Sequence, residues 1–343
     1  MLSSTIILSL ITILSALTNI NGKIWPVSIR RISFENKEEF PKFLISCIDG
    51  QELEGKKSIK ISDRIPPKNN TSKQFLLSDL RLDPMGRGFI GNVSTIEDFY
   101  KNLSLKAKGK SILFYFPSYG PSLNKIFNDC EKINREKKFL MIPCIYPIFQ
   151  EKYNHKISFI GGKSHLLDEA YFTDEVNKNI ELFAKNIKNV CNLHTDGNLN
   201  CIMHGTGTRL LNSMKSVGFN KKTFENLFLV GPDLDSDIFI NFKSNDPGHF
   251  ISSISKKIHI IYNPNDKFLK SLNRLKKIPR LGLVGSPTNN LMKSITNICQ
   301  GNCEKSTHWS DLFRNHFYMQ SDPLISYINS AIGLGDENYS TPQ

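Results

Sequence analysis

The chain has 343 residues, of which 39% are hydrophobic, and carries a formal net charge of +12. That length can bury the core of one sizeable α/β domain or of two small ones. The positive charge is spread over short lysine groups, as at 55–57, 255–257 and 275–277, with no run of five basic residues. No alternation of aromatic and basic residues marks a surface on which bases could stack. The composition therefore argues against a nucleic-acid-binding protein and indicates a lysine-rich, solvated surface.

The first residues predict a secretory signal peptide spanning 1–22. Residues 5–17 are uncharged and apolar, fewer than the ~20 residues that a membrane span needs. At the end of this run, Ala16 and Thr18 are small residues with the spacing typical of a cleavage site. No Lys or Arg precedes the apolar run, which departs from the usual form, and an uncleaved anchor or a buried strand is the alternative. After cleavage we expect no stable transmembrane span and a secreted or lumenal protein.

Two further features agree with the secretory pathway. Acceptor triplets for N-glycosylation occur at five asparagines: Asn69, Asn70, Asn92, Asn102 and Asn338. The 7 cysteines allow several disulfides. Cys191/Cys201 and Cys299/Cys303 are candidate bridges, although the sequence does not fix the pairing. Because the chain has no C-x-x-C pair and its histidines are scattered, we expect no metal and no cofactor.

Residues 23–94 predict a short, loop-rich leader with some β-structure, packed on the main domain. Short apolar runs at 25–29, 43–48 and 75–82 are separated by turn-forming residues, including a Pro- and Asn-rich loop at 65–73.

From residue 95 the pattern becomes regular. Thr95 is a possible helix cap, and apolar residues at 96, 99, 100 and 103 have helical spacing. Two apolar runs of strand length, 111–116 and 138–146, enclose a segment whose apolar residues from 123 to 133 share one helical face. After an irregular segment at 147–175, residues 176–190 predict an amphipathic helix.

The second half continues the alternation. We predict strands at 199–204, 226–232 and 257–263, and a helix from 206 to about 218. Strands that are nearly continuous in apolar residues, alternating with helices, predict an α/β domain over 95–330: a mostly parallel sheet with helices on both faces. Residues 331–343 predict a disordered tail. Functional groups are expected at the carboxyl ends of the strands.

Six short motifs follow these strands in order. They read "FPSYG" (116–120), "CIYP" (144–147), "MHGTGTR" (203–209), "GPDLD" (231–235), "NPNDKFL" (263–269) and "NHFYM" (315–319). The set resembles the α/β-hydrolases of unknown function whose members carry "VHGYN", "FSWPS", "AHSMGTR", "APDVD", "SRNDRAL" and "GHSYF". The resemblance spans roughly 95–330 and implies an α/β-hydrolase fold.

Position by position, the resemblance implies Asp266 as the acid and His316 as the histidine of a catalytic triad, while the nucleophile falls on Gly205. The His-Gly pair that shapes the family's oxyanion site is Pro117-Ser118 here. Tyr119 and Thr206 complete the expected pocket. Glycine has no atom that a histidine can deprotonate, and it relieves the strain of the nucleophile turn. Proline also removes a backbone donor.

Other residues are alternatives for each role. Thr206 is the alternative nucleophile, Asp233 and Asp235 are alternative acids, and His308 is the second histidine. The segment "IGGKS" (160–164) lacks the first glycine of a phosphate-binding loop.

Three functions fit the sequence. The first is a catalytically inactive hydrolase-like protein that binds a small-molecule, lipid or ester ligand, or a protein partner. The second is an active esterase or lipase with a rearranged nucleophile. The third is a structural surface glycoprotein.

Overall fold

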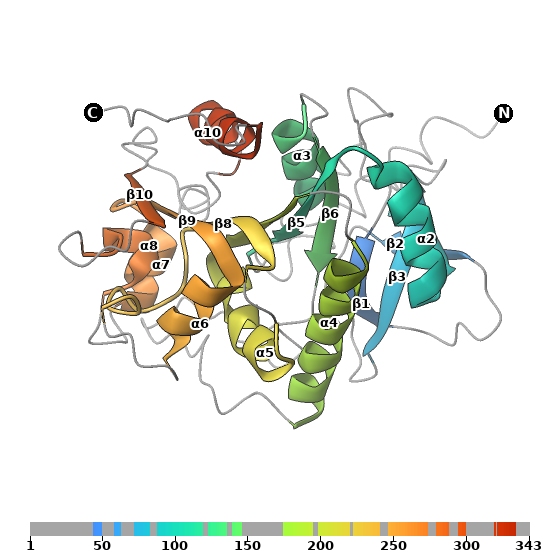
Figure 1. Ribbon diagram of the computed structural model, residues 1–343, viewed down its shortest axis with the longest axis horizontal. Coiled ribbons are helices and arrows are strands. Elements are labelled where there is room, and N and C mark those ends of the chain that lie inside the picture. Colours follow the sequence, from blue (N-terminus) through green and yellow to red (C-terminus); the bar gives the residue numbers. More distant parts are fainter. Residues whose placement is uncertain are drawn as a thin grey trace, which may run out of the picture. The chain divides into compact units, whose positions relative to one another are not determined.

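The apolar runs of the sequence form the strands of one sheet in the computed structural model (Figure 1). The structure describes residues 44–49, 58–62, 72–82, 88–118, 123–135, 139–145, 174–194, 198–219, 222–240, 246–273, 279–287, 294–299, 319 and 321–333. The strands are β1 (Leu44–Asp49), β2 (Ser58–Ser62), β3 (Ser72–Leu82), β4 (Gly88–Ser94), β5 (Ser111–Phe116), β6 (Phe139–Ile145), β7 (Leu199–His204), β8 (Phe224–Val230), β9 (Ser255–Tyr262) and β10 (Ile295–Cys299). The helices are α2 (Ile96–Ala107), α3 (Leu123–Ile133), α4 (Asp174–Leu193), η2 (Gly205–Arg209, 3₁₀), α5 (Leu210–Ser216), α6 (Pro247–Ile254), α7 (Lys267–Asn273), α8 (Leu281–Val284) and α10 (Asp322–Gly333).

The 10-stranded sheet has the order β10-β9-β8-β7-β5-β6-β1-β3-β4-β2. From β10 to β6 every neighbouring pair is parallel. β1 joins β6 in parallel through the pairs Ile45–Cys144 and Ser46–Ile145. The pairs β1–β3, β3–β4 and β4–β2 are antiparallel. The parallel strands therefore share one carboxyl edge, where an open α/β sheet carries its functional loops.

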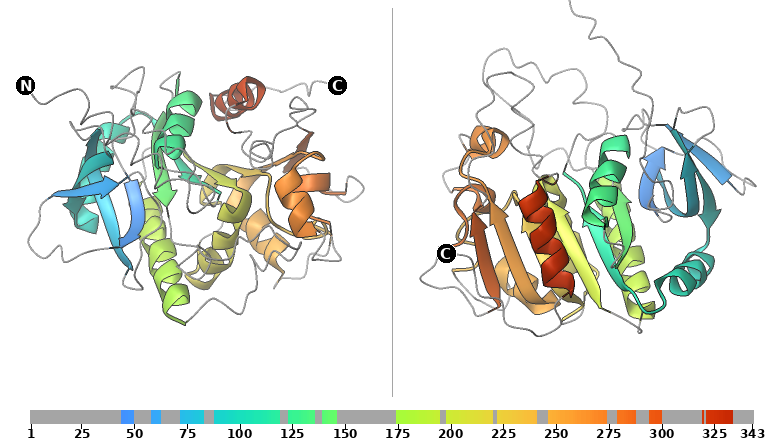
Figure 2. Two further views of the ribbon diagram at one scale, coloured as in Figure 1. Left: turned by 180° about the vertical axis from the view of Figure 1, so that it is seen from behind. Right: turned by 90° about the horizontal axis from the view of Figure 1, so that it is seen from above.

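Helices cover both faces of the parallel strands (Figures 1 and 2). On one face α2 contacts α4, α4 contacts α5 and α5 contacts α6, and the core there includes Ile112, Phe114 and Phe116 of β5. On the other face α3 contacts α10, and the Tyr115 hydroxyl donates to Asp129 of α3 at 3.4 Å. Burial, and next the Asp129 charge, raise the pKa of Tyr115 well above its usual value. Because β5 is covered on both faces, its apolar residues are continuous rather than alternating.

A line of polar side chains, buried in the sheet and half-buried at Tyr327, crosses the sheet beneath α10. Asn226 of β8 donates from Nδ2 to Oδ1 of Asn200 on β7 at 2.8 Å. His259 of β9 has Nε2 3.0 Å from Asn226 Oδ1 and Nδ1 2.7 Å from the hydroxyl of Tyr327 on α10. Since an amide oxygen only accepts, Nε2 carries the proton and Nδ1 accepts from Tyr327. We call these four residues the polar seam.

Burial keeps His259 uncharged. Its ring stacks on Phe228, with centroids 4.5 Å apart. Burial, and to a lesser extent the charge of Lys257, lower the pKa of His259 from 6.5 to about 4. The neutral imidazole can accept from Tyr327 while donating to Asn226, so it links the sheet to α10.

Most of the predicted main-domain elements are confirmed. The predicted strands at 111–116, 138–146, 199–204, 226–232 and 257–263 match β5 to β9 within three residues. Thr95 caps α2, its hydroxyl accepting from Asp98 N at 3.1 Å. α6, α7, α8, β10 and α10 were not predicted. Residues 331–333, expected in the tail, belong to α10.

One cysteine expectation is wrong. Cys191 and Cys201 are free, buried thiols rather than a bridge, because each packs into the apolar core. Cys303 lies outside the described residues, as do the predicted signal peptide at 1–22 and most of the segment at 147–175. Within the described ranges, no helix has the length and apolar character needed to cross a membrane.

Candidate functional site

The chain turns sharply where β7 ends. His204 is extended, with φ −105° and ψ 129°, whereas Gly205 has φ 52°. This left-handed conformation costs a residue with a Cβ about 1–2 kcal/mol, and glycine adopts it freely. η2 and α5 follow at once. We call Gly205–Arg209 the elbow, because a strand, a left-handed turn and a helix form the local geometry that presents a hydrolase nucleophile.

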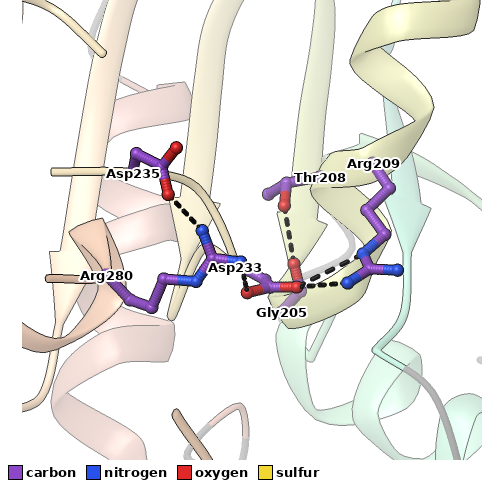
Figure 3. Close-up of polar contacts among 6 residues, drawn as sticks. All are labelled: Gly205, Thr208, Arg209, Asp233, Asp235 and Arg280. Atoms are coloured by element: carbon purple, nitrogen blue, oxygen red, sulfur yellow. Dashed lines mark hydrogen bonds and ion pairs between the residues drawn. The ribbon is translucent and has the colours of Figure 1, made fainter. Parts of the chain in front are cut away.

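The threonines of the elbow are directed into the turn and the core. The Thr208 hydroxyl donates to the carbonyl oxygen of Gly205 at 2.7 Å (Figure 3). Such a side-chain bond to the residue three positions earlier stabilises the turn itself. Thr206 is 1% exposed. At the apex of the elbow, Gly205 offers no nucleophilic atom.

The elbow packs directly on the end of β5. A Cβ built on Gly207 would lie 2.6 Å from the carbonyl oxygen of Phe116 and 3.2 Å from that of Pro117. Glycine therefore permits a backbone approach that any other residue would block. Pro117 and Ser118 are buried beside this contact. The structure thus places the elbow against the Pro117–Ser118 segment, whereas Tyr119 lies outside the described residues.

A path of backbone hydrogen bonds connects the elbow to the loop after β9. Asp233 N donates to Gly205 O at 3.3 Å, and Gly282 N donates to Pro232 O at 3.0 Å. Asn263 N donates to Gly282 O at 2.9 Å. The loops after β7, β8 and β9 are therefore joined at the carboxyl edge of the sheet.

Asp266, the residue expected as the acid, lies at the end of this path. Its N–H donates to Asn263 O at 3.0 Å. Its Oδ1 accepts from Leu269 N at 2.9 Å, so it caps α7. The side chain is buried. His316 and the alternative His308 lie outside the described residues, so their distance from Asp266 stays a prediction.

Asp233 and Asp235, the alternative acids, belong to one ion-pair cluster in which Asp233 is buried and the Asp235 side chain is exposed (Figure 3). Asp233 Oδ2 accepts from Arg209 Nε at 3.2 Å and Nη2 at 2.9 Å, and Arg280 Nη2 lies 2.8 Å from its Oδ1. Arg280 also pairs with Asp235 through Nη1. Because both Asp233 oxygens face guanidinium groups, its carboxylate is engaged in ion pairs rather than free to orient a histidine.

The two arginines were missed by sequence reasoning. Arg209 ends the "HGTGTR" motif, so the resemblance gave a signal for its position but none for its role. Arg280 lies in a lysine-rich stretch with no distinguishing pattern. Only the fold brings it to Asp233, through the hydrogen bond from Leu281 N to Leu234 O at 2.7 Å.

The buried thiols are unsuited to nucleophilic chemistry. Burial raises the pKa of Cys130, Cys144, Cys191 and Cys201 well above the usual thiol value, and a protonated thiol is a poor nucleophile.

Among the residues that the structure describes, no group of three or more His, Cys, Asp or Glu side chains could hold a metal ion.

Comparison with known proteins places this geometry in a family. Residues 103–331 match the family described as "Alpha/beta hydrolase of unknown function (DUF900)". No curated protein matches the chain. A solved structure that resembles it is the thermostable carboxylesterase EstE1, cloned from a metagenomic library, with 10% identity and a TM-score of 0.34 over 81% of this chain and 90% of that chain. At that identity the esterase's activity does not transfer to this chain. From the family match over most of its length, the chain belongs to the α/β hydrolases of unknown function.

Proposed function

We propose that this protein is a catalytically inactive α/β-hydrolase-like protein that acts by binding a small-molecule, lipid or ester ligand, or a protein partner. The observation that carries the proposal is Gly205 at the apex of the elbow, with φ 52° and no side chain. A triad requires an oxygen or sulfur at that point. The nearby hydroxyl of Thr208 is bonded to the Gly205 carbonyl, and Thr206 is buried.

The oxyanion segment supports the same proposal. Pro117 has no N–H to give to a developing oxyanion, and it lies beside the elbow through the close approach of Gly207. Losing one oxyanion donor typically lowers kcat by about 10²–10³. The absent nucleophile and the absent donor thus weaken two separate parts of hydrolytic catalysis.

The test compares wild type with Gly205→Ser and Gly205→Ala. Each protein is treated with a fluorophosphonate probe and with p-nitrophenyl esters of short acyl chains. We expect no labelling or turnover by wild type or Gly205→Ala, and labelling of Gly205→Ser at the new serine. The alanine variant carries the same backbone strain without the hydroxyl. Ester turnover by wild type that disappears in Thr206→Val would replace the proposal with an esterase that uses a rearranged nucleophile.

Ligand binding without hydrolysis has its own readout. A compound that binds the folded state raises Tm in a concentration-dependent way. We expect p-nitrophenyl butyrate to raise the Tm of wild type and to be recovered intact. No shift with esters of any chain length, together with no turnover, would exclude an ester ligand and leave a protein partner or a purely structural role.

We further propose that the protein acts in the secretory pathway after removal of residues 1–22. Support comes from the apolar run at 5–17 and the acceptor triplet at Asn92, which lies exposed on β4. N-terminal sequencing of the protein from its own cells should begin near residue 23, and glycosidase treatment should lower its apparent mass. A protein that retains Met1 and carries no glycan contradicts this placement.

A further inference from the structure

We propose that Asp233 is a positioning residue that fixes the conformation of the elbow from both of its ends. Its backbone N–H donates to the carbonyl oxygen of Gly205, the first residue of the elbow, at 3.3 Å. Its Oδ2 accepts two hydrogen bonds from Arg209, the last residue of the elbow, at 3.2 and 2.9 Å. One residue of the loop after β8 therefore holds the first and last residues of the five-residue turn (Figure 3).

A second ion pair anchors Asp233 to the rest of the sheet edge. Arg280 Nη2 lies 2.8 Å from Asp233 Oδ1, with side-chain exposures of 3% and 0%. Arg280 is the residue immediately before α8, and its neighbour Leu281 donates to Leu234 O at 2.7 Å. Removing one partner of a buried ion pair is strongly destabilising, because it leaves a charge uncompensated where water does not reach it. We call the contacts of Asp233 with Gly205, Arg209 and Arg280 the clamp. The clamp thus joins the elbow to the loop after β8 and to the segment before α8.

The clamp explains how the elbow keeps a nucleophile-presenting shape with no nucleophile on it. A left-handed turn persists where the surrounding contacts over-determine it. The Thr208 hydroxyl and Asp233 N both bond to the Gly205 carbonyl, and neither contact involves a side chain at 205. The turn is therefore expected to survive Gly205→Ser, a consequence that rests on the proposed function.

Asp235 provides a matched control. It also pairs with Arg280, but its side chain is 42% exposed and it lies at the outer end of the ion-pair cluster in Figure 3. Asp233→Asn removes the charge that holds Arg209, whereas Asp235→Asn removes an equal charge from the same cluster without changing the Arg209 contacts.

Hydrogen exchange followed by mass spectrometry tests the clamp in the full chain without using catalysis. We expect Asp233→Asn to speed exchange of the amides in 205–209 about tenfold, and Asp235→Asn to change it less than twofold. The amides of β5, Ser111–Phe116, report global opening, so the change in exchange at the elbow is judged relative to the change at β5 in each variant. Equal exchange at the elbow in wild type and Asp233→Asn would overturn the proposal, as would equal acceleration by the two variants.

Arg209→Gln replaces Asp233→Asn if the latter does not fold. Faster exchange of the amides in 205–209 is expected, and exchange equal to that of wild type would overturn the proposal. Arg209→Lys, which keeps the charge but loses the forked contact, should fall between wild type and Arg209→Gln.

Labelling of Gly205→Ser adds a readout that separates positioning from stability. In that reaction the serine Oγ bonds to phosphorus, the P–F bond breaks, and fluoride and the serine proton leave. We expect Asp233→Asn to slow labelling of Gly205→Ser at least tenfold, while Asp235→Asn leaves it within twofold at matched Tm. Labelling that is equal in the two double variants contradicts the clamp. If Gly205→Ser is not labelled at all, the result contradicts the proposed function, which expects the rest of the active-site geometry to be retained. The exchange experiment then decides the role of Asp233 by itself.

Discussion

Acidification should destabilise this protein through His259, and the size of the effect follows from how far burial lowers the pKa of that residue. Burial lowers the pKa of His259 from 6.5 to about 4. The folded state therefore favours the neutral imidazole, and the unfolded chain binds the proton more readily. Stability from this residue is complete above pH 6.5, falls as the pH drops below that value, and is lost below about 4. One pKa unit corresponds to about 1.4 kcal/mol, so the full loss is about 3 kcal/mol, and about 2 kcal/mol is lost by pH 5.

Urea denaturation from pH 7.5 to 4.5 measures this loss, with His259→Gln as the comparison. Glutamine can donate to Asn226 and accept from Tyr327 but does not titrate. Carboxylates and the other histidines contribute equally to both proteins, so the difference in unfolding free energy isolates His259. The difference should shrink steadily below pH 6.5. A difference that stays constant across this range would refute the reasoning. Tyr327→Phe should lower stability at neutral pH by about 1 kcal/mol while keeping the pH slope.

Three further experiments test a close backbone contact, a helix cap and the state of two cysteines. Gly207→Ala should cost about 1–3 kcal/mol or more in urea denaturation, because its Cβ would lie 2.6 Å from a backbone oxygen. Gly109→Ala has the left-handed φ of 71° but open space around it, so about 1–2 kcal/mol is expected from the backbone alone. A cost well below about 1 kcal/mol for Gly207→Ala would exclude crowding at that position. Thr95→Ala should cost about 1 kcal/mol by removing the cap of α2, and Thr95→Ser much less. Cys191 and Cys201 should be alkylated by iodoacetamide only after unfolding, and a bridged peptide in a non-reduced digest would show otherwise.

The sequence predicted the central elements of the fold because their signals are local. β5 and β6 are continuous apolar runs of strand length, and the apolar stripe of α4 repeats with the helical period. α6 and β10 were missed for local reasons too. α6 has 8 residues and begins at a proline, while β10 has 5 residues that include polar ones. Short elements like these are held by their neighbours in the fold rather than by their own pattern.

The candidate site was predictable only where a motif carried it. The position of the elbow follows from "HGTG" after an apolar strand, and its left-handed apex at Gly205 agrees. The ion pair between Asp233 and Arg280 joins residues whose proximity depends on how the loop after β8 meets α8. The Cys191/Cys201 expectation failed for a related reason, because short separation in sequence does not set the geometry between two side chains.

The parallel pairing between β1 and β6 has a consequence for how much of the chain must be kept together. The family match begins at residue 103, after β1–β4, yet β1 occupies the side of β6 that faces away from β5. β6 is apolar and almost wholly buried. Without β1 its unpaired amides and carbonyls would be open to a strand of another molecule, which is how self-association through sheet edges begins. A fragment trimmed to the family boundary should therefore form soluble aggregates or precipitate, whereas the longer chain shields that edge itself.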